Sequence, residues 1–161
     1  MERLLILAML ATPIATRHHE VLHEVLHSAP VTLSSTEQVY IAPTLRDLVD
    51  ALIYVESGGI ENAIGDRHFK KPSVGVLQLR PIMVREVNRI LKRRNSTKRY
   101  TLQDRFSKNK SIEMFLIWKG FHHEGSSFEK IARGWNGGPR GHKKKSTLKY
   151  WRKVQKQLKK I

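Results

Sequence analysis

The strongest candidate for chemistry in this sequence is a carboxylate at the end of an amphipathic helix. Apolar residues with helical spacing form one predicted buried stripe: Leu45, Leu48, Val49, Leu52 and Ile53. At about 100° per residue, the next position on that stripe is Glu56, just before the helix-ending pair Gly58-Gly59. Loss of hydration and the helix dipole both raise a carboxyl pKa there, which suits a general acid. The alternative is a carboxylate at a frayed last turn that reaches water.

A second pattern with chemical potential lies near the N-terminus. Residues 19–27 read HEVLHEVLH, two overlapping copies of the H-E-x-x-H motif of zinc proteases. Only 18 residues precede the motif and Pro30 soon follows it, so upstream substrate-binding structure has no room. We interpret the repeat as low-complexity linker sequence and expect no metal and no cofactor. Adventitious metal binding and a zinc protease are the alternatives.

The elements that must position Glu56 are predicted to be mainly helical. Residues 60–80 are rich in turn-forming glycine and proline and predict a short loop or small hairpin. No alternation long enough for a large sheet occurs. Besides the helix that carries Glu56, the periodicity predicts a helix from Pro81 to about residue 91, a central buried helix over 112–121, a helix capped by Ser126 and Glu129, and a last helix over 148–161.

Length and composition predict one folded domain with a basic half. The 161 residues are 40% hydrophobic, enough for a core, and no cysteine is present, which excludes disulfide scaffolds and thiol nucleophiles. Residues 1–91 hold 9 basic and 10 acidic residues, whereas residues 92–161 hold 21 basic and 4 acidic residues. Such a basic half indicates a polyanionic partner: nucleic acid, an anionic membrane or an anionic cell-wall polymer.

The N-terminal quarter differs in character from the rest. Residues 1–16 resemble the hydrophobic part of a signal peptide, with a buried or disordered N-terminal helix as the alternative. Residues 17–42 form the predicted linker, and residues 43–161 the predicted folded domain.

Four short motifs, in this order, resemble the transglycosylase SLT domain family. They are Glu56-Ser57-Gly58, the segment GVLQL at residues 75–79 with Pro81, the segment GWNGG at residues 134–138, and the segment TLKY at residues 147–150. The likeness covers residues 44–155, and it extends to the compact versions of the domain in phages and mobile elements. It implies a lysozyme-like fold.

The resemblance implies a role for each matching residue. Glu56 matches the catalytic acid/base of the family. The residues that match substrate-contacting positions are Ser57, Gln78, Trp135, Asn136 and Tyr150. Trp135 stands where the family usually has tyrosine, so the hydroxyl of that position is lost here. Each match also has a structural alternative, as a turn, capping or core residue.

The implied reaction is cleavage of peptidoglycan between N-acetylmuramic acid and N-acetylglucosamine. A lytic transglycosylase needs one carboxylate, whereas hydrolysis usually needs two. Asp66 is the candidate second carboxylate, with Glu61 next, although a Gly-Asp pair in a loop is more often a turn. The alternatives are a lysozyme-type muramidase, a non-catalytic wall-binding or virion protein, and a nucleic-acid-binding protein.

The predicted partners and location follow from that reaction. Peptidoglycan strands are the expected substrate, other anionic wall polymers are further partners, and nucleic acid would bind only non-specifically. We expect a monomer that is exported to the cell envelope or carried on a phage particle.

Overall fold

The helix that carries Glu56 has the limits that the sequence predicts. The computed structural model describes residues 42–160, so the predicted signal peptide, the histidine repeat and the predicted linker up to residue 41 lie outside the described residues. Helix α2 spans Leu45–Ser57 and begins with a capping box between Thr44 and Asp47. It ends at Gly58, which adopts a left-handed conformation with φ 65°.

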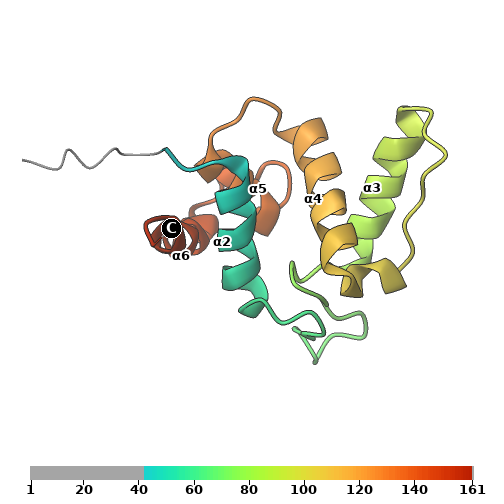
Figure 1. Ribbon diagram of the computed structural model, residues 1–161, viewed down its shortest axis with the longest axis horizontal. Coiled ribbons are helices and arrows are strands. Elements are labelled where there is room, and N and C mark those ends of the chain that lie inside the picture. Colours follow the sequence, from blue (N-terminus) through green and yellow to red (C-terminus); the bar gives the residue numbers. More distant parts are fainter. Residues whose placement is uncertain (1–41, 161) are drawn as a thin grey trace, which may run out of the picture. The chain divides into compact units, whose positions relative to one another are not determined.

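Two helices follow the loop after α2 and run side by side in the same direction (Figure 1). Helix α3 spans Pro81–Arg93, with proline in its first turn as predicted. A short 3₁₀ helix, η2, spans Gln103–Phe106, and α4 spans Lys108–His122 and packs against α3. The predicted central buried helix over 112–121 corresponds to α4, but only one face of it is buried, because Leu116 and Phe121 are exposed. Its buried face carries Met114, Phe115 and Trp118.

The C-terminal part of the fold brings its last helix back to α2. Helix α5 spans Phe128–Gly137, the 3₁₀ turns η3 and η4 span Gly141–Lys143 and Lys145–Thr147, and α6 spans Leu148–Leu158. Helix α6 packs against both α2 and α5, as Figure 1 shows. The predicted capping box at Ser126 and Glu129 is wrong by one residue. Ser127 caps α5, because the backbone of Ser126 closes a turn onto His123.

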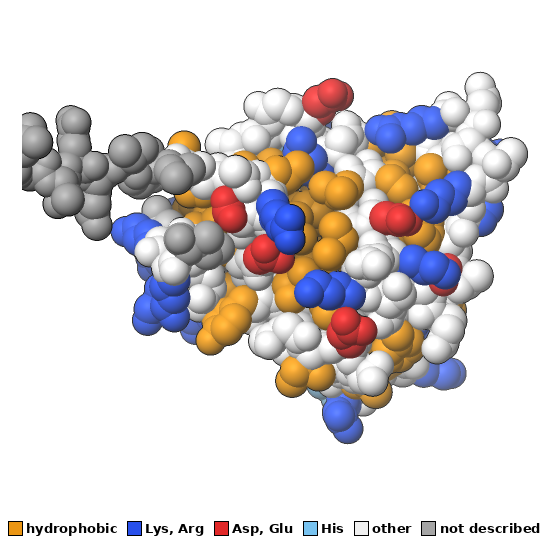
Figure 2. Space-filling model, viewed as in Figure 1, with side chains coloured by type: hydrophobic (Ala, Val, Ile, Leu, Met, Phe, Trp, Pro, Cys, Tyr) orange, Lys and Arg blue, Asp and Glu red, His pale blue; other side chains and the backbone are white. Residues whose placement is uncertain are grey.

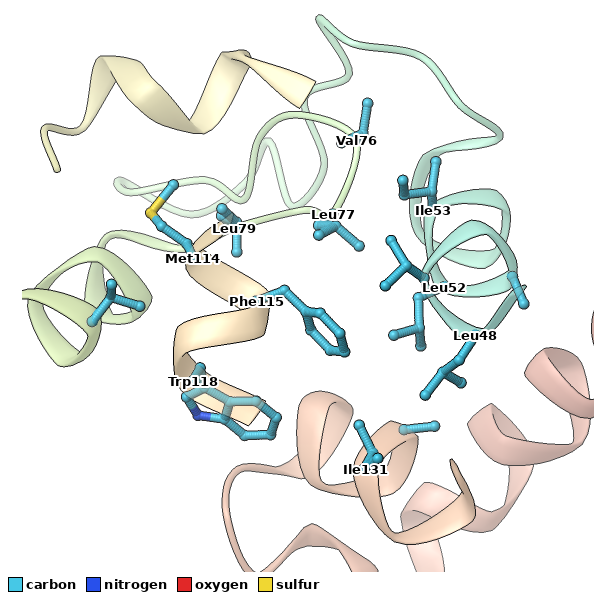
Figure 3. Packing of buried hydrophobic residues seen from close by; sticks show 14 of the residues in the cluster. Leu48, Leu52, Ile53, Val76, Leu77, Leu79, Met114, Phe115, Trp118 and Ile131 are labelled. Atoms are coloured by element: carbon cyan, nitrogen blue, oxygen red, sulfur yellow. The ribbon is translucent and has the colours of Figure 1, made fainter. Parts of the chain in front are cut away.

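The core lies between α2, α4, α5 and the loop before α3. Figure 3 shows side chains from all four meeting in one cluster. Leu48 and Leu52 of α2, Phe115 of α4 and Ile131 of α5 are fully buried there. Burial of the α2 stripe therefore fixes the orientation of the helix and of the carboxylate that follows on the same face.

Residues 58–80, which we call the 58–80 loop, form an irregular segment with two isolated β-bridges. Val74 pairs with both Ile64 and Leu79 in antiparallel fashion. Gly75 has φ 79°, and a Cβ atom there would lie 1.9 Å from the Arg105 carbonyl oxygen, so only glycine fits. The prediction of a mainly α fold with a short loop or small hairpin is confirmed. No helix within residues 42–160 is long and apolar enough to cross a membrane.

Candidate active site around Glu56

Glu56 lies in the last turn of α2 and is half-buried. Its pKa is raised from 4.5 to about 7, and the main cause is burial, which disfavours the charged form. The nearby negative charge of Asp66 acts in the same direction. Hydrogen-bond donation by Tyr150 and Trp135 and the positive charge of Lys153 oppose the rise. Glu56 is therefore present in both protonation states near neutral pH.

Tyr150 is the direct partner of this carboxyl group. Its phenol hydroxyl donates a hydrogen bond of 2.7 Å to Oε1 of Glu56 across 94 residues of sequence. Burial and the adjacent carboxylate raise the pKa of Tyr150 well above its usual value, so the phenol stays protonated and remains a donor.

A small polar network lies just before α6, three residues from Tyr150. The buried hydroxyl of Thr147 lies 2.8 Å from the Gly141 carbonyl oxygen and accepts a 3.0 Å hydrogen bond from Nε of Arg133. Arg133 is itself held by an ion pair with Glu129, one helical turn earlier in α5. These bonds tie the turn that precedes α6 to α5.

Trp135 reaches the site from α5. Its ring packs edge-to-face against Phe115 at 5.1 Å and Trp118 at 5.3 Å, between ring centroids. These contacts fix the indole near the Glu56 carboxyl, whose pKa it lowers. Asn136 follows on the same helix and is exposed to solvent.

Gln78 is bound within the 58–80 loop. Its Nε2 donates to the carbonyl oxygens of Gly75 at 2.9 Å and Ala63 at 3.4 Å, and its Oε1 accepts a 3.0 Å hydrogen bond from Ser73. The residue also has a left-handed backbone, with φ 48°. These contacts give Gln78 a role in closing the loop.

Ser57 joins α2 to that loop. Its hydroxyl donates to the Val76 carbonyl oxygen at 2.9 Å and accepts a hydrogen bond from the Gly59 backbone at 3.2 Å. Asp66 lies on the loop, is exposed, and contacts the Ser73 hydroxyl at 3.3 Å. Glu61 is exposed on the same loop. The structure thus gathers Glu56, Tyr150, Trp135 and Asp66, with Ser57 and Gln78 bonded to the loop backbone beside them.

Two positioning residues are absent from the sequence-based prediction. Arg105 is buried and donates to the carbonyl oxygens of Pro72 and Leu79, which ties these two parts of the 58–80 loop together. His123 is buried against Gly134, where an added Cβ would lie 2.3 Å from its Nε2. In the sequence, Arg105 would be expected on the surface, because arginine is mostly exposed in folded proteins. No motif or periodic pattern connects His123 with Gly134.

Metal binding has no support in the described part of the chain. Residues 42–160 contain no group of three or more histidine or acidic side chains that could hold a metal ion. The predicted absence of a metal at residues 19–27 stays a prediction.

Comparison with known proteins identifies the fold. The sequence matches no protein-family model and no curated protein. The structure is similar to a chain of the crystal structure of Aeromonas hydrophila PliI in complex with Meretrix lusoria lysozyme, with 22% identity, a TM-score of 0.58, and coverage of 72% of this chain and 93% of that chain.

A second solved structure gives the same result. It is the inhibitor-bound lysozyme from Meretrix lusoria, with 23% identity, a TM-score of 0.56, and coverage of 69% of this chain and 88% of that chain. The fold is therefore lysozyme-like, as predicted. Membership of the SLT family stays a prediction.

Proposed function

We propose that the protein is a lytic transglycosylase that cleaves the bond between N-acetylmuramic acid and N-acetylglucosamine in peptidoglycan. The observation that carries the proposal is the half-buried Glu56 carboxyl, with a pKa of about 7, held by Tyr150 on a lysozyme-like fold. A general acid is most effective when its pKa lies near the working pH.

The proposed reaction uses this one group twice. Protonated Glu56 gives its proton to the glycosidic oxygen as the bond from that oxygen to C1 of N-acetylmuramic acid breaks. The resulting carboxylate then accepts the proton of the C6 hydroxyl, whose oxygen bonds to C1 and closes a 1,6-anhydro ring. Tyr150 steadies the carboxylate between the two steps, because its hydrogen bond favours the charged form.

The other predicted site residues have supporting roles in this proposal. Trp135 offers an apolar surface to a sugar ring, and Asn136 is exposed and free to contact polar groups of the glycan. Ser57 and Gln78 act on substrate mainly by shaping the loop, because their polar atoms bind backbone groups of that loop.

A lysozyme-type hydrolase is the second candidate, and Asp66 favours it. The negative charge of Asp66 acts on Glu56, so the two carboxylates are near enough to influence one another. If Asp66 activates a water molecule on the opposite face of the sugar, the bond is hydrolysed with inversion. The products then carry reducing ends in place of anhydro ends.

The proposed substrate sets the place of action. Peptidoglycan lies outside the cytoplasmic membrane, so we propose that the protein is exported or carried on a phage particle and acts on wall strands as a monomer. The alternative within this fold is a non-catalytic wall-binding protein, because a fold does not by itself guarantee an activity.

Digestion of purified sacculi by the full chain tests the proposal. We expect Glu56→Gln to lower the release of soluble fragments by roughly 100-fold or more, as for loss of a general acid. Glu124→Gln removes an exposed acid between α4 and α5 that has no proposed role, and is the matched control, expected to keep full activity. Equal activity of wild type and Glu56→Gln would remove Glu56 from the mechanism.

Mass spectrometry of the fragments separates the candidates. Anhydro ends, lighter by one water than reducing ends, together with an active Asp66→Asn variant support the transglycosylase. Reducing ends and an inactive Asp66→Asn variant support the hydrolase. Sacculi that bind the protein and release no fragments would support the non-catalytic alternative.

A further inference from the structure

Unpaired positive charge is concentrated in the last part of the described chain. Residues 138–160 contain ten lysine and arginine residues and no acidic residue. The ion pairs formed among residues 42–160 all lie outside that segment. Lys144 donates to the Gly137 carbonyl oxygen at 2.7 Å, and Lys160 lies over the Tyr54 ring. The other cations are available to an external anion.

Much of this charge lies on one face of α6 and its last turn. Five exposed basic residues repeat with helical spacing and form what we call the α6 basic stripe: Lys149, Arg152, Lys153, Lys156 and Lys160. At a rise of about 1.5 Å per residue, the stripe runs for about 16 Å. The opposite face carries buried Val154 and packs towards α2 and α5. In Figure 2, lysine and arginine side chains gather over the position of α6.

The α6 basic stripe borders the candidate active site. Tyr150 lies between Lys149 and Lys153 on the same two turns and bonds to Glu56. The charge of Lys153 also acts on the Glu56 carboxyl. An anion bound along the stripe therefore lies beside the ligand at Glu56, and the simplest source is an anionic group attached to that ligand.

The composition of the stripe indicates the kind of anion. Four of its five residues are lysine, which acts as a point charge and lacks the planar fork with which arginine recognises a single carboxylate or phosphate. A row of point charges suits a chain of regularly repeated anionic groups. The aromatic residues of α6, Tyr150 and Trp151, are half-buried, so the helix offers no stacking platform for nucleic-acid bases.

We propose that the α6 basic stripe binds a phosphodiester polymer attached to the wall glycan that is cleaved at Glu56. This inference rests on the proposed function, since the glycan supplies the link between the two sites. Binding along the stripe holds the protein on the wall and directs strands that carry the polymer to Glu56. The contact is electrostatic and therefore weakens as salt rises.

Binding is tested with full-length protein carrying Glu56→Gln, which is expected to bind without cutting. Its sedimentation is measured with sacculi that carry a poly(glycerol phosphate) polymer, and with the same sacculi after hydrofluoric acid has removed that polymer. The stripe variant adds Lys149→Gln, Arg152→Gln and Lys156→Gln. The control variant adds Arg85→Gln, Lys92→Gln and Lys108→Gln, which removes the same three charges from exposed positions of α3 and α4.

We expect the stripe variant to lose about tenfold in affinity for polymer-bearing sacculi, as for loss of three exposed charge contacts, and the control variant to lose much less. The dependence of log affinity on log salt should become shallower by about two to three in the stripe variant only. On polymer-free sacculi the two variants should bind alike. Circular dichroism of each variant shows whether it is folded. The salt dependence of the protein with an intact stripe is the reference for both variants.

Three results would overturn the inference. Equal losses in both variants would mean that net charge alone matters. Undiminished binding of the unsubstituted stripe to polymer-free sacculi would point to carboxylates of the peptide stems. Tighter binding to duplex DNA than to soluble poly(glycerol phosphate) at physiological salt, lost in the stripe variant, would identify nucleic acid. Cleavage is measured separately, with the protein in which Glu56 is intact. If that protein does not cleave sacculi but binding still depends on the stripe, the proposed function is refuted and the inference about binding is not.

Discussion

The raised pKa of the half-buried Glu56 leads us to expect that the Glu56→Gln variant is more stable than wild type at high pH, where the wild-type carboxyl group is ionised. The folded state raises the pKa of Glu56 from 4.5 to about 7, so the native protein prefers the protonated form. The stabilising contribution is complete below about pH 4.5 and is lost as pH rises through about 7. A shift of this size corresponds to about 3 kcal/mol, and because Glu56 is only half-buried we expect about 2 kcal/mol.

The assay is urea unfolding of wild type and Glu56→Gln, followed by tryptophan fluorescence at about pH 5 and pH 8. Other groups titrate alike in both proteins, so their effects cancel in the difference. We subtract the free energy of unfolding of wild type from that of the variant at each pH. This difference should be about 2 kcal/mol larger at pH 8 than at pH 5. A difference that does not change between the two pH values would mean that Glu56 is hydrated in the folded state, and would contradict the raised pKa.

The site contacts lead to further expected outcomes. Tyr150→Phe removes the 2.7 Å donor to Glu56, so the pKa of that carboxyl should rise by about one unit in a carbon-13 NMR titration, whereas Tyr100→Phe, remote from the site, should leave it unchanged. Gly134→Ala places a methyl group 2.3 Å from the buried histidine ring and should destabilise the protein by about 1–3 kcal/mol in urea unfolding. Gly120→Ala in α4, with its nearest atom 3.9 Å away, should be neutral or stabilising, and equal effects of the two substitutions would contradict the packing argument.

The parts of the fold that could be predicted depend on local signals. The limits of α2 follow from the Thr44 cap and the Gly58 terminator, and the side on which Glu56 lies follows from the stripe of apolar residues before it. Proline in the first turn of α3 is equally local. Each signal acts within a few turns of its own helix, so the sequence is sufficient to recognise it.

The parts that escaped prediction depend on contacts between distant segments. Ser127 caps α5 in place of Ser126, because a tertiary turn at His123 takes the backbone of Ser126. Arg105 ties together Pro72 and Leu79 of a loop that lies about 30 residues earlier in the chain. Leu116 is exposed although it sits in a continuous apolar run. No periodic pattern identifies such partners, because each contact exists only once the helices are packed.

The properties of Glu56 combine both kinds of information. Its helix brings the carboxyl out of water and raises the pKa, which local sequence predicts, while α6 supplies Tyr150 and Lys153, which lower it again. Burial favours the protonated form, and the donors and Lys153 favour the ionised form, which together place the pKa at about 7. In the proposed reaction a single group first gives and then accepts a proton, and a pKa of about 7 makes both forms accessible near neutral pH. The same helix carries the α6 basic stripe, so acid/base balance and attraction to polyanions are built into one element.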